Sequence, residues 1–177
     1  TDDSGNSSTC TFDVTVVDTT SPAITCAAAP ASVEATSSSG AAVSWTASTQ
    51  ATATDAGDDN VAISYSPASG SVFAIGTTTV TATATDDSGN SSTCTFDVTV
   101  VDTTSPAITC ASAPATAEAT SSAGAAVTYG AATATDTGDD SVAITYSAAS
   151  GSTFAIGTTT VTATATDDSG NSSTCTF

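Results

Sequence analysis

The sequence predicts an all-β protein made of antiparallel β-sandwich domains in tandem. Three observations lead to this prediction. Turn-forming residues recur about every 8 to 15 positions, the segments between them alternate in polarity with period 2, and one twelve-residue segment occurs three times unchanged. No stretch has the 3.6-residue periodicity of an amphipathic helix.

The repeated segment sets the predicted domain boundaries. Its copies follow one another at spacings of 84 and 81 residues and occupy positions 1–12, 85–96 and 166–177. Periods this long indicate whole domains in tandem rather than a solenoid. We expect a terminal strand of a preceding repeat, a complete domain, and a second domain that lacks the end of its last strand, over residues 1–17, 18–101 and 102–177. The chain is therefore expected to be a segment of a longer protein.

The expected strands of the complete domain are, in chain order, 21–26, 40–45, 61–66, 71–75, 77–85 and 93–100. The first four are short runs between turn residues. In the fifth, Val80, Ala82 and Ala84 share one face and threonines share the other, as period 2 requires. The sixth strand follows an Asp-Asp-Ser-Gly-Asn turn with the same alternation, so the last two strands should form a hairpin. The insertion 48–50, which the second copy lacks, is expected to be a loop.

Matching aromatic positions predict a thin core. The two copies place their rings at equivalent points, namely Trp45 and Tyr129, Tyr65 and Tyr146, Phe73 and Phe154, and Phe96 and Phe177. Four rings in about 80 residues leave each domain marginally stable by burial alone. The short linker 101–106, made of Val, Asp, Thr, Ser and Pro, should hold neighbouring domains nearly in line.

The charge composition excludes most functional classes. The chain has 18 acidic residues, no Lys, Arg or His, and a net charge of −18. Without His or Lys it cannot form a Ser-His-Asp or Cys-His catalytic system or a Schiff base, so we expect no enzymatic activity. Without Lys and Arg, nucleic acids and anionic membrane surfaces are poor partners. No apolar run approaches the length of a membrane span, so no membrane insertion is expected.

The five cysteines are expected to reinforce the core. Cys26 and Cys94 each lie on the apolar face of their strand, which predicts the disulfides Cys26–Cys94 and Cys110–Cys175 and leaves Cys10 for a residue outside the segment. An alternative pairs Cys10 with Cys26 and Cys94 with Cys110, and leaves Cys175 for a downstream partner. Either scheme requires an oxidising compartment and predicts an extracellular or cell-surface location.

Acidic clusters are the candidate metal ligands. They recur in each Asp-Asp-Ser-Gly-Asn turn and at equivalent positions of the two domains, at Asp55, Asp58, Asp59, Asp136, Asp139 and Asp140. Several carboxylates together suit Ca²⁺, which would be the one expected cofactor. The alternative interpretation is turn chemistry, because Asp, Asn and Gly are also the residues that β-turns select, and neither cluster has the spacing of an EF-hand loop.

Candidate glycosylation sites are of two kinds. Asn6, Asn90 and Asn171 each begin an Asn-Ser-Ser sequon at the same turn of the repeat. O-linked glycans are expected on the outward threonines, namely Thr79, Thr81, Thr83, Thr95 and Thr99. These threonines also have a simpler explanation, because the β-branched side chain suits a strand and the hydroxyl tolerates water.

The chain resembles the HYR (hyalin repeat) family at Ile24–Cys26, at Gly76–Asp86, and at Gly89-Asn90 followed by Cys94-Thr95-Phe96. The resemblance covers nearly all of both units. It implies immunoglobulin-like extracellular modules in tandem, with a structural or adhesive role and no catalytic residue. Many HYR units carry a second cysteine pair, and the corresponding positions here hold Tyr65 and Ala82, and Tyr146 and Ala163. The loss of that pair leaves Cys26 and Cys94 as the remaining partners.

These observations predict a structural segment of a secreted or cell-surface fibre, with covalently attached glycans and copies of itself as partners. The alternative is an adhesin stalk or a binding module that recognises a glycan or a surface protein. Two arrangements of the fibre are open. One is a continuous array, and the other is head-to-tail assembly in which the leading strand 9–17 of one subunit completes the last unit of its neighbour.

Overall fold

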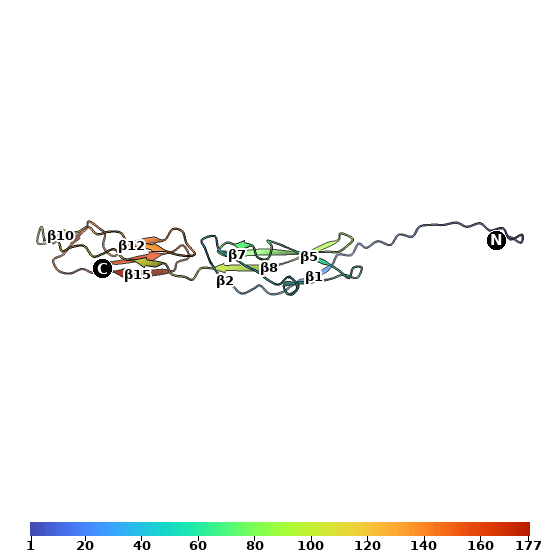
Figure 1. The fold of residues 1–177 in the computed structure, drawn as a ribbon, viewed down its shortest axis with the longest axis horizontal. Coiled ribbons are helices and arrows are strands. Elements are labelled where there is room, and N and C mark those ends of the chain that lie inside the picture. The colour runs from blue at the N-terminus through green and yellow to red at the C-terminus, as the bar shows by residue number, and fades with distance from the viewer.

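The computed structural model describes residues 1–177 and contains two β-rich units placed end to end. Figure 1 shows the units in line along the longest axis, with the N-terminal segment running away from the first unit as an extended tail. The predicted all-β class is confirmed. The structure contains no helix whose length and apolarity would let it traverse a bilayer.

The first unit is a β-sandwich. Its elements are β1 (Ala23–Cys26), β2 (Val33–Glu34), β3 (Ala41–Ala42), α1 (Ala47–Gln50), β4 (Ala51–Thr54), β5 (Ala62–Ser66), β6 (Val72–Phe73), β7 (Gly76–Thr85) and β8 (Ser91–Val101). A four-stranded sheet has the order β2-β8-β7-β5, and the pairs β1-β4 and β3-β6 form the remainder. β1 packs across β7 and β8, so the β1-β4 pair covers one face of the larger sheet.

The second unit repeats this plan with fewer strands. Its elements are β9 (Ala107–Thr109), β10 (Ala125–Ala126), β11 (Thr133–Thr135), β12 (Ala143–Tyr146), β13 (Thr153–Phe154), β14 (Thr162–Thr166) and β15 (Ser172–Thr176). The main sheet has the order β12-β14-β15, beside the pairs β9-β11 and β10-β13. No strand corresponds to β2, whose partner in the first unit is the end of β8, Val100–Val101.

The predicted hairpin forms the centre of the four-stranded sheet of the first unit. β7 and β8 pair antiparallel from Gly76↔Val100 to Thr85↔Ser91. The turn between them closes with the Asp86 N–H donating to the Asn90 carbonyl at 3.1 Å, and Gly89 has a φ of +90°, which L-residues with a side chain rarely adopt. The alternation is as expected, because every second residue of β7 from Val80 is buried.

The core of the first unit combines β-branched residues with the predicted rings. Val80, Val98 and Val100 are fully buried, and Trp45 packs edge-on against Phe96 with ring centroids 5.3 Å apart. The disulfide Cys26–Cys94, with Cα atoms 5.8 Å apart, joins β1 to β8 and so links the two layers. The core is small, so the disulfide supplies part of the stability that a larger domain would gain from burying apolar surface.

The second unit has a thinner core. Val161, Ala163 and Ala165 of its central strand region are buried, but all four of its aromatic rings are only half-buried. Tyr129 and Phe177 pack at 5.0 Å between centroids. The disulfide Cys110–Cys175 occupies the position equivalent to that of the first unit. Of the two pairings considered from the sequence, the structure contains the one within each unit.

Three details differ from the sequence-based expectations. The insertion 48–50 lies in the helical turn α1 rather than in an irregular loop, because Gln50 is buried and its Nε2 donates to the Ala28 carbonyl at 3.2 Å. β2 and β4 were not anticipated, and the expected strand 40–45 is reduced to β3. Each of these strands is defined by long-range pairing, which local alternation does not reveal.

The register places opposite each other the two positions that correspond to the second cysteine pair of the family resemblance. Tyr65 lies directly opposite Ala82, and Tyr146 lies directly opposite Ala163. The two positions are therefore cross-strand neighbours in both units, as the members of a cysteine pair would be.

Candidate functional site

Three aspartates converge at the junction between the two units. Asp102 follows β8 in the linker, Asp136 follows β11, and Asp167 follows β14, and their carboxylate atoms lie within 4.8 Å of one another. Asp102 and Asp167 are buried, with 8% and 5% of their surface exposed. We call these three residues the junction cluster.

Asp167 is held by the hairpin turn that follows it. Its Oδ1 accepts from the Asn171 backbone N–H at 2.7 Å, and its Oδ2 accepts from the Asn171 Nδ2 at 3.0 Å. The same Nδ2 donates to the Asp102 carbonyl at 3.1 Å. The side chain of Asn171 therefore ties the linker to the turn and fixes the position of one carboxylate of the cluster.

The other two carboxylates of the junction cluster are only half satisfied. Asp102 Oδ1 accepts from the Thr104 N–H at 3.1 Å, and Asp136 Oδ1 accepts from the Gly138 N–H at 2.7 Å. The Oδ2 atoms of Asp102 and Asp136 are buried and have no hydrogen-bond donor. Buried carboxylate oxygens without a partner are costly, so they point to a ligand that supplies positive charge.

A glycine makes room for the linker carboxylate. A Cβ atom at Gly138 would lie 2.5 Å from Asp102 Cγ, which is closer than non-bonded atoms approach. Any other residue there would push the carboxylate of Asp102 away. The sequence Asp-x-Gly after β11 thus both supplies one carboxylate and admits a second.

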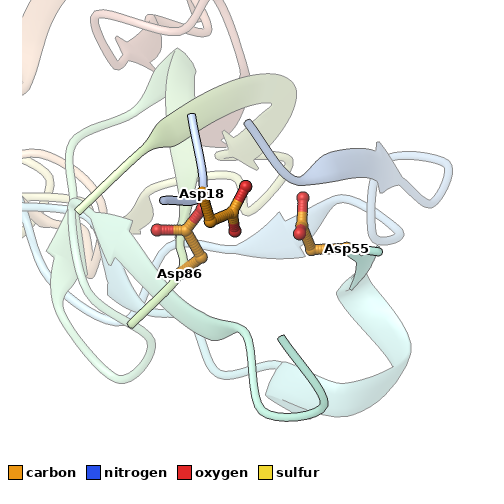
Figure 2. Close-up of side chains that lie close together, drawn as sticks. All are labelled: Asp18, Asp55 and Asp86. Atoms are coloured by element: carbon orange, nitrogen blue, oxygen red, sulfur yellow. The ribbon is translucent and has the colours of Figure 1, made fainter. Parts of the chain in front are cut away.

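The first unit repeats the arrangement. Asp18, Asp55 and Asp86, the first-unit cluster, have carboxylate atoms within 4.8 Å of one another, and Figure 2 shows their side chains coming from three separate segments of the chain. Asp18 Oδ2 is buried without a donor, as Asp102 Oδ2 is. Burial raises the pKa of Asp86, but hydrogen bonds from the side chain and backbone of Asn90 outweigh it and hold this pKa below its usual range.

The structure divides the six acidic residues predicted as metal ligands into three pairs. Asp55 and Asp136 belong to the clusters. Asp58 and Asp139 lie beside the clusters, and each accepts a hydrogen bond from a backbone N–H of the hairpin turn, at 3.0 and 3.1 Å respectively. Asp59 and Asp140 are exposed and lie outside the clusters.

Asp18 and Asp102 are not part of the acidic clusters expected from the sequence, whereas Asp86 and Asp167 open two of the Asp-Asp-Ser-Gly-Asn turns that are. A signal for them was present. Each directly follows a predicted strand or opens the linker, and each recurs at the same position of the repeat. These residues meet because the topology brings several strand ends to the same pole of the sandwich, and this cannot be predicted from composition alone.

The linker is also held from the side of the first unit. Glu34 Oε1 accepts from the Thr103 N–H at 2.7 Å and from the Thr104 hydroxyl at 3.0 Å, and Oε2 accepts from the Thr103 hydroxyl at 3.0 Å. The backbone hydrogen bond from Thr103 is the main cause that holds the pKa of Glu34 below its usual range, against the opposing effect of burial. Ser38 adds a direct contact between the units, donating to Asp140 Oδ2 at 2.6 Å.

An apolar face of the second unit lacks the cover that it has in the first. In the first unit, Val98 and Val100 of β8 belong to one buried cluster with Val43 and Phe73. In the second unit, the corresponding face forms a groove lined by residues that include Val127, Tyr129, Phe154, Val161 and Phe177. Ile156 beside it is 72% exposed, whereas its counterpart Ile75 is 38% exposed.

The N-terminal tail carries the sequence that covers this face in the first unit. Residues 12–17 are identical to residues 96–101 of β8. In the tail, Phe12, Val14 and Val16 are 83%, 77% and 91% exposed. Cys10 is exposed and unpaired within the chain, so its predicted partner outside the segment stays a prediction.

The outward face of the β7–β8 hairpin is lined by hydroxyl groups. Of the threonines predicted to carry O-linked glycans, the exposed ones are Thr79 and Thr95, and the half-buried ones are Thr81, Thr83 and Thr99. Thr79 donates to Asp97 Oδ1 at 2.8 Å across the strands. The exposed hydroxyls are sterically open to modification, and glycosylation itself stays a prediction.

The three predicted N-glycosylation sites differ in their surroundings. Asn6 is exposed, and its Nδ2 donates to Asp2 at 2.9 Å. Asn90 and Asn171 are partly buried, and the Nδ2 of each donates both to the carboxylate that opens its turn and to a linker carbonyl. A glycan on either of these two nitrogens would have to displace at least one of these hydrogen bonds.

Comparison with known proteins agrees with this architecture. The family model described as the HYR domain matches residues 17–100 and again residues 101–177. In an alignment 176 positions long, which covers 96% of this chain, the sequence is 38% identical to "Hyalin" of Strongylocentrotus purpuratus, and the chain spans 14% of the length of that relative. The two matches meet where β8 ends and the linker begins. Two tandem matches that cover nearly the whole chain show that it belongs to the HYR domain family.

Proposed function

We propose that this chain is a non-catalytic structural segment of an extracellular or cell-surface fibre, in which HYR units follow one another in line. The observation that carries the proposal is the junction. Glu34 holds the linker from one unit while Asn171 holds it from the other. A linker held at both ends transmits tension and bending from unit to unit, which a load-bearing array requires.

The compartment is supported by the cysteines. Both units contain a disulfide between their layers, and structural disulfides persist in oxidising surroundings. The lack of catalysis is supported by the composition, since the chain has no His, Lys or Arg with which to build the usual nucleophile, acid–base or anion-binding sites. The family resemblance points to the same role.

Copies of the same strand are the proposed partners. The groove of the second unit fits the segment that reads Asp-Val-Thr-Val-Val in β8, because the same apolar positions receive Val98 and Val100 in the first unit. This strand can be supplied as the continuation of a longer chain, or as the tail of a neighbouring copy by strand addition. Both arrangements produce a fibre of the same local geometry.

Charged substitutions in the tail test strand addition. In the double variant Val14→Asp and Val16→Asp, the apolar face of the tail becomes acidic, and self-association of the purified chain should be lost if tails bind neighbouring grooves. The matched control places the same charges on the opposite face of the same segment, as Thr11→Asp and Thr15→Asp, and should associate as the unmodified chain does. Analytical ultracentrifugation measures both. A chain that stays monomeric in every form excludes strand addition and leaves the continuous array.

Cryo-electron microscopy of the native material tests the fibre and its glycans together. Units that repeat along an ordered filament, with density beyond the Thr79 and Thr95 side chains, would support a glycosylated structural polymer. Isolated rods with bare hydroxyl faces would instead favour the alternative of an adhesin stalk or binding module, whose ligand would be a glycan or a surface protein. Mass spectrometry of peptides that cover residues 77–99 would locate the modified threonines.

A further inference from the structure

We propose that the junction cluster of Asp102, Asp136 and Asp167 binds a divalent cation, Ca²⁺ by preference, and that the bound ion fixes the linker to the second unit. This goes beyond the proposed function, because it applies to the chain in solution whether or not the chain assembles into a fibre.

The buried, unpartnered oxygen of Asp102 carries the inference. Asp102, a member of the cluster, is 8% exposed, and its Oδ2 is buried without any hydrogen-bond donor. Asp136 Oδ2 is likewise buried and has no hydrogen-bond donor. The chain contains no Lys, Arg or His, so no side chain can neutralise these carboxylates. No side chain supplies the positive charge that would compensate these carboxylates, and a cation from solution can supply it.

The geometry suits a single ion. The carboxylate atoms of the three residues lie within 4.8 Å of one another. Ca²⁺ takes oxygen ligands at about 2.3–2.6 Å, so two of its ligands can lie at most about 5 Å apart. All three carboxylates can therefore contact one central ion with small adjustments of their side chains.

The donor set selects the class of metal. Every candidate ligand is a carboxylate or carbonyl oxygen, and both thiols of the second unit are oxidised in the Cys110–Cys175 disulfide. Hard oxygen donors favour Ca²⁺ and Mg²⁺ over zinc or copper. Ca²⁺ accepts irregular coordination, whereas Mg²⁺ demands a near-ideal octahedron, so three carboxylates from three separate segments favour Ca²⁺.

The position of the ligands gives the ion a mechanical role. Asp102 belongs to the linker, while Asp136 and Asp167 belong to the body of the second unit. An ion shared by all three would pin the linker to that body, opposite the contacts that Glu34 makes from the first unit. The first-unit cluster repeats the arrangement at Asp18, Asp55 and Asp86, so the chain is expected to bind two ions.

The test is a calcium titration of the 177-residue chain by isothermal titration calorimetry after treatment with a chelator, at constant ionic strength and up to about 10 mM Ca²⁺, the range of weak extracellular sites. We expect two sites. Asp102→Asn should weaken one of them at least tenfold, and Asp136→Asn should reproduce this effect. The control Asp168→Asn removes the same charge from the neighbouring exposed residue and should change the affinity less than twofold. Circular dichroism verifies that each variant is folded.

Hydrogen exchange provides the second readout. Ca²⁺ should slow exchange of the linker amides 101–106 at least tenfold in the unmodified chain and in Asp168→Asn, but not in Asp102→Asn. Mg²⁺ at the same concentration should have a smaller effect. The proposal is overturned if no binding occurs up to 10 mM, if Asp102→Asn and Asp168→Asn weaken binding equally, or if linker exchange is the same with and without Ca²⁺.

Discussion

The disulfide Cys26–Cys94 should contribute a large part of the stability of the first unit. The perturbation is the double variant Cys26→Ala and Cys94→Ala, made in a Cys10→Ser background so that the exposed thiol of Cys10 cannot exchange with other cysteines. The bond connects the end of β1 to the first half of β8. Its loss removes the covalent link between two layers whose apolar contact is small.

The expected magnitude follows from the length of the loop that the bond closes. The two cysteines are 68 residues apart in sequence. In the loop-entropy treatment, a loop of this length corresponds to about 4 kcal/mol of stabilisation at 25 °C. Whole domains are stable by only about 5–15 kcal/mol, and a thin core places this unit near the lower end of that range. The variant should therefore be close to its unfolding midpoint without denaturant.

The single tryptophan makes the measurement specific to one unit. Trp45 is the only tryptophan of the chain, lies in the first unit, and packs against Phe96. Guanidinium unfolding followed by its fluorescence should show the full loss in the Cys26/Cys94 variant. The control removes the equivalent bond of the second unit, Cys110–Cys175, which should leave the Trp45 transition almost unchanged.

Two results would refute this reasoning. A loss of less than about 1 kcal/mol in the Cys26/Cys94 variant would mean that packing, and not the crosslink, holds the two layers together. An equal shift of the Trp45 transition in the Cys110/Cys175 control would mean that the two units unfold as one cooperative body, and that the junction couples them strongly.

Three further predictions use the same chain. Phe73→Ala should destabilise the first unit by about 3–5 kcal/mol, whereas Phe154→Ala at the half-buried equivalent position should cost about half as much in unfolding monitored by circular dichroism. Gly40→Ala should cost about 2 kcal/mol in the same assay, because Gly40 has a φ of +102° and a Cβ there would collide with the Phe73 carbonyl. The pKa of Glu34 is lowered in the folded state, so its contribution is present above its ordinary value of 4.5 and lost as the pH falls through the lower folded pKa. Thermal melts at several acidic pH values should therefore show a smaller loss of stability in Glu34→Gln than in the unmodified chain.

The sequence predicts the architecture well where the signal is local or repeated. The alternation along Thr77–Thr85 predicts β7, and the facing of Cys26 and Cys94 predicts the disulfide that the structure contains. The short strands β2 and β4 could not be predicted in this way. They are defined by pairing with β8 and β1, and neither pairing leaves a trace in the local pattern.

The acidic clusters illustrate the same limit at the candidate site. The run around Asp136 stands out because its acidic residues are neighbours in sequence, yet only one of them joins the junction cluster. Asp102 and Asp167 come from positions 34 residues before and 31 residues after it, and they meet because three strand ends reach the same pole of the sandwich. The chemistry of the site is visible in the composition, whereas its membership depends on the topology.

The three identical copies of the twelve-residue segment show what decides local structure in this chain. The copies at 85–96 and 166–177 both consist of a strand end, a turn and a paired strand, whereas the copy at 1–12 has no strand partner. Because the sequences are identical, this difference arises from the presence or absence of neighbouring strands. Strand formation in this protein is therefore a property of the assembled unit. In an array of such units, the linker contacts of Glu34 on one side and of Asn171 on the other would then determine how one unit is oriented against the next.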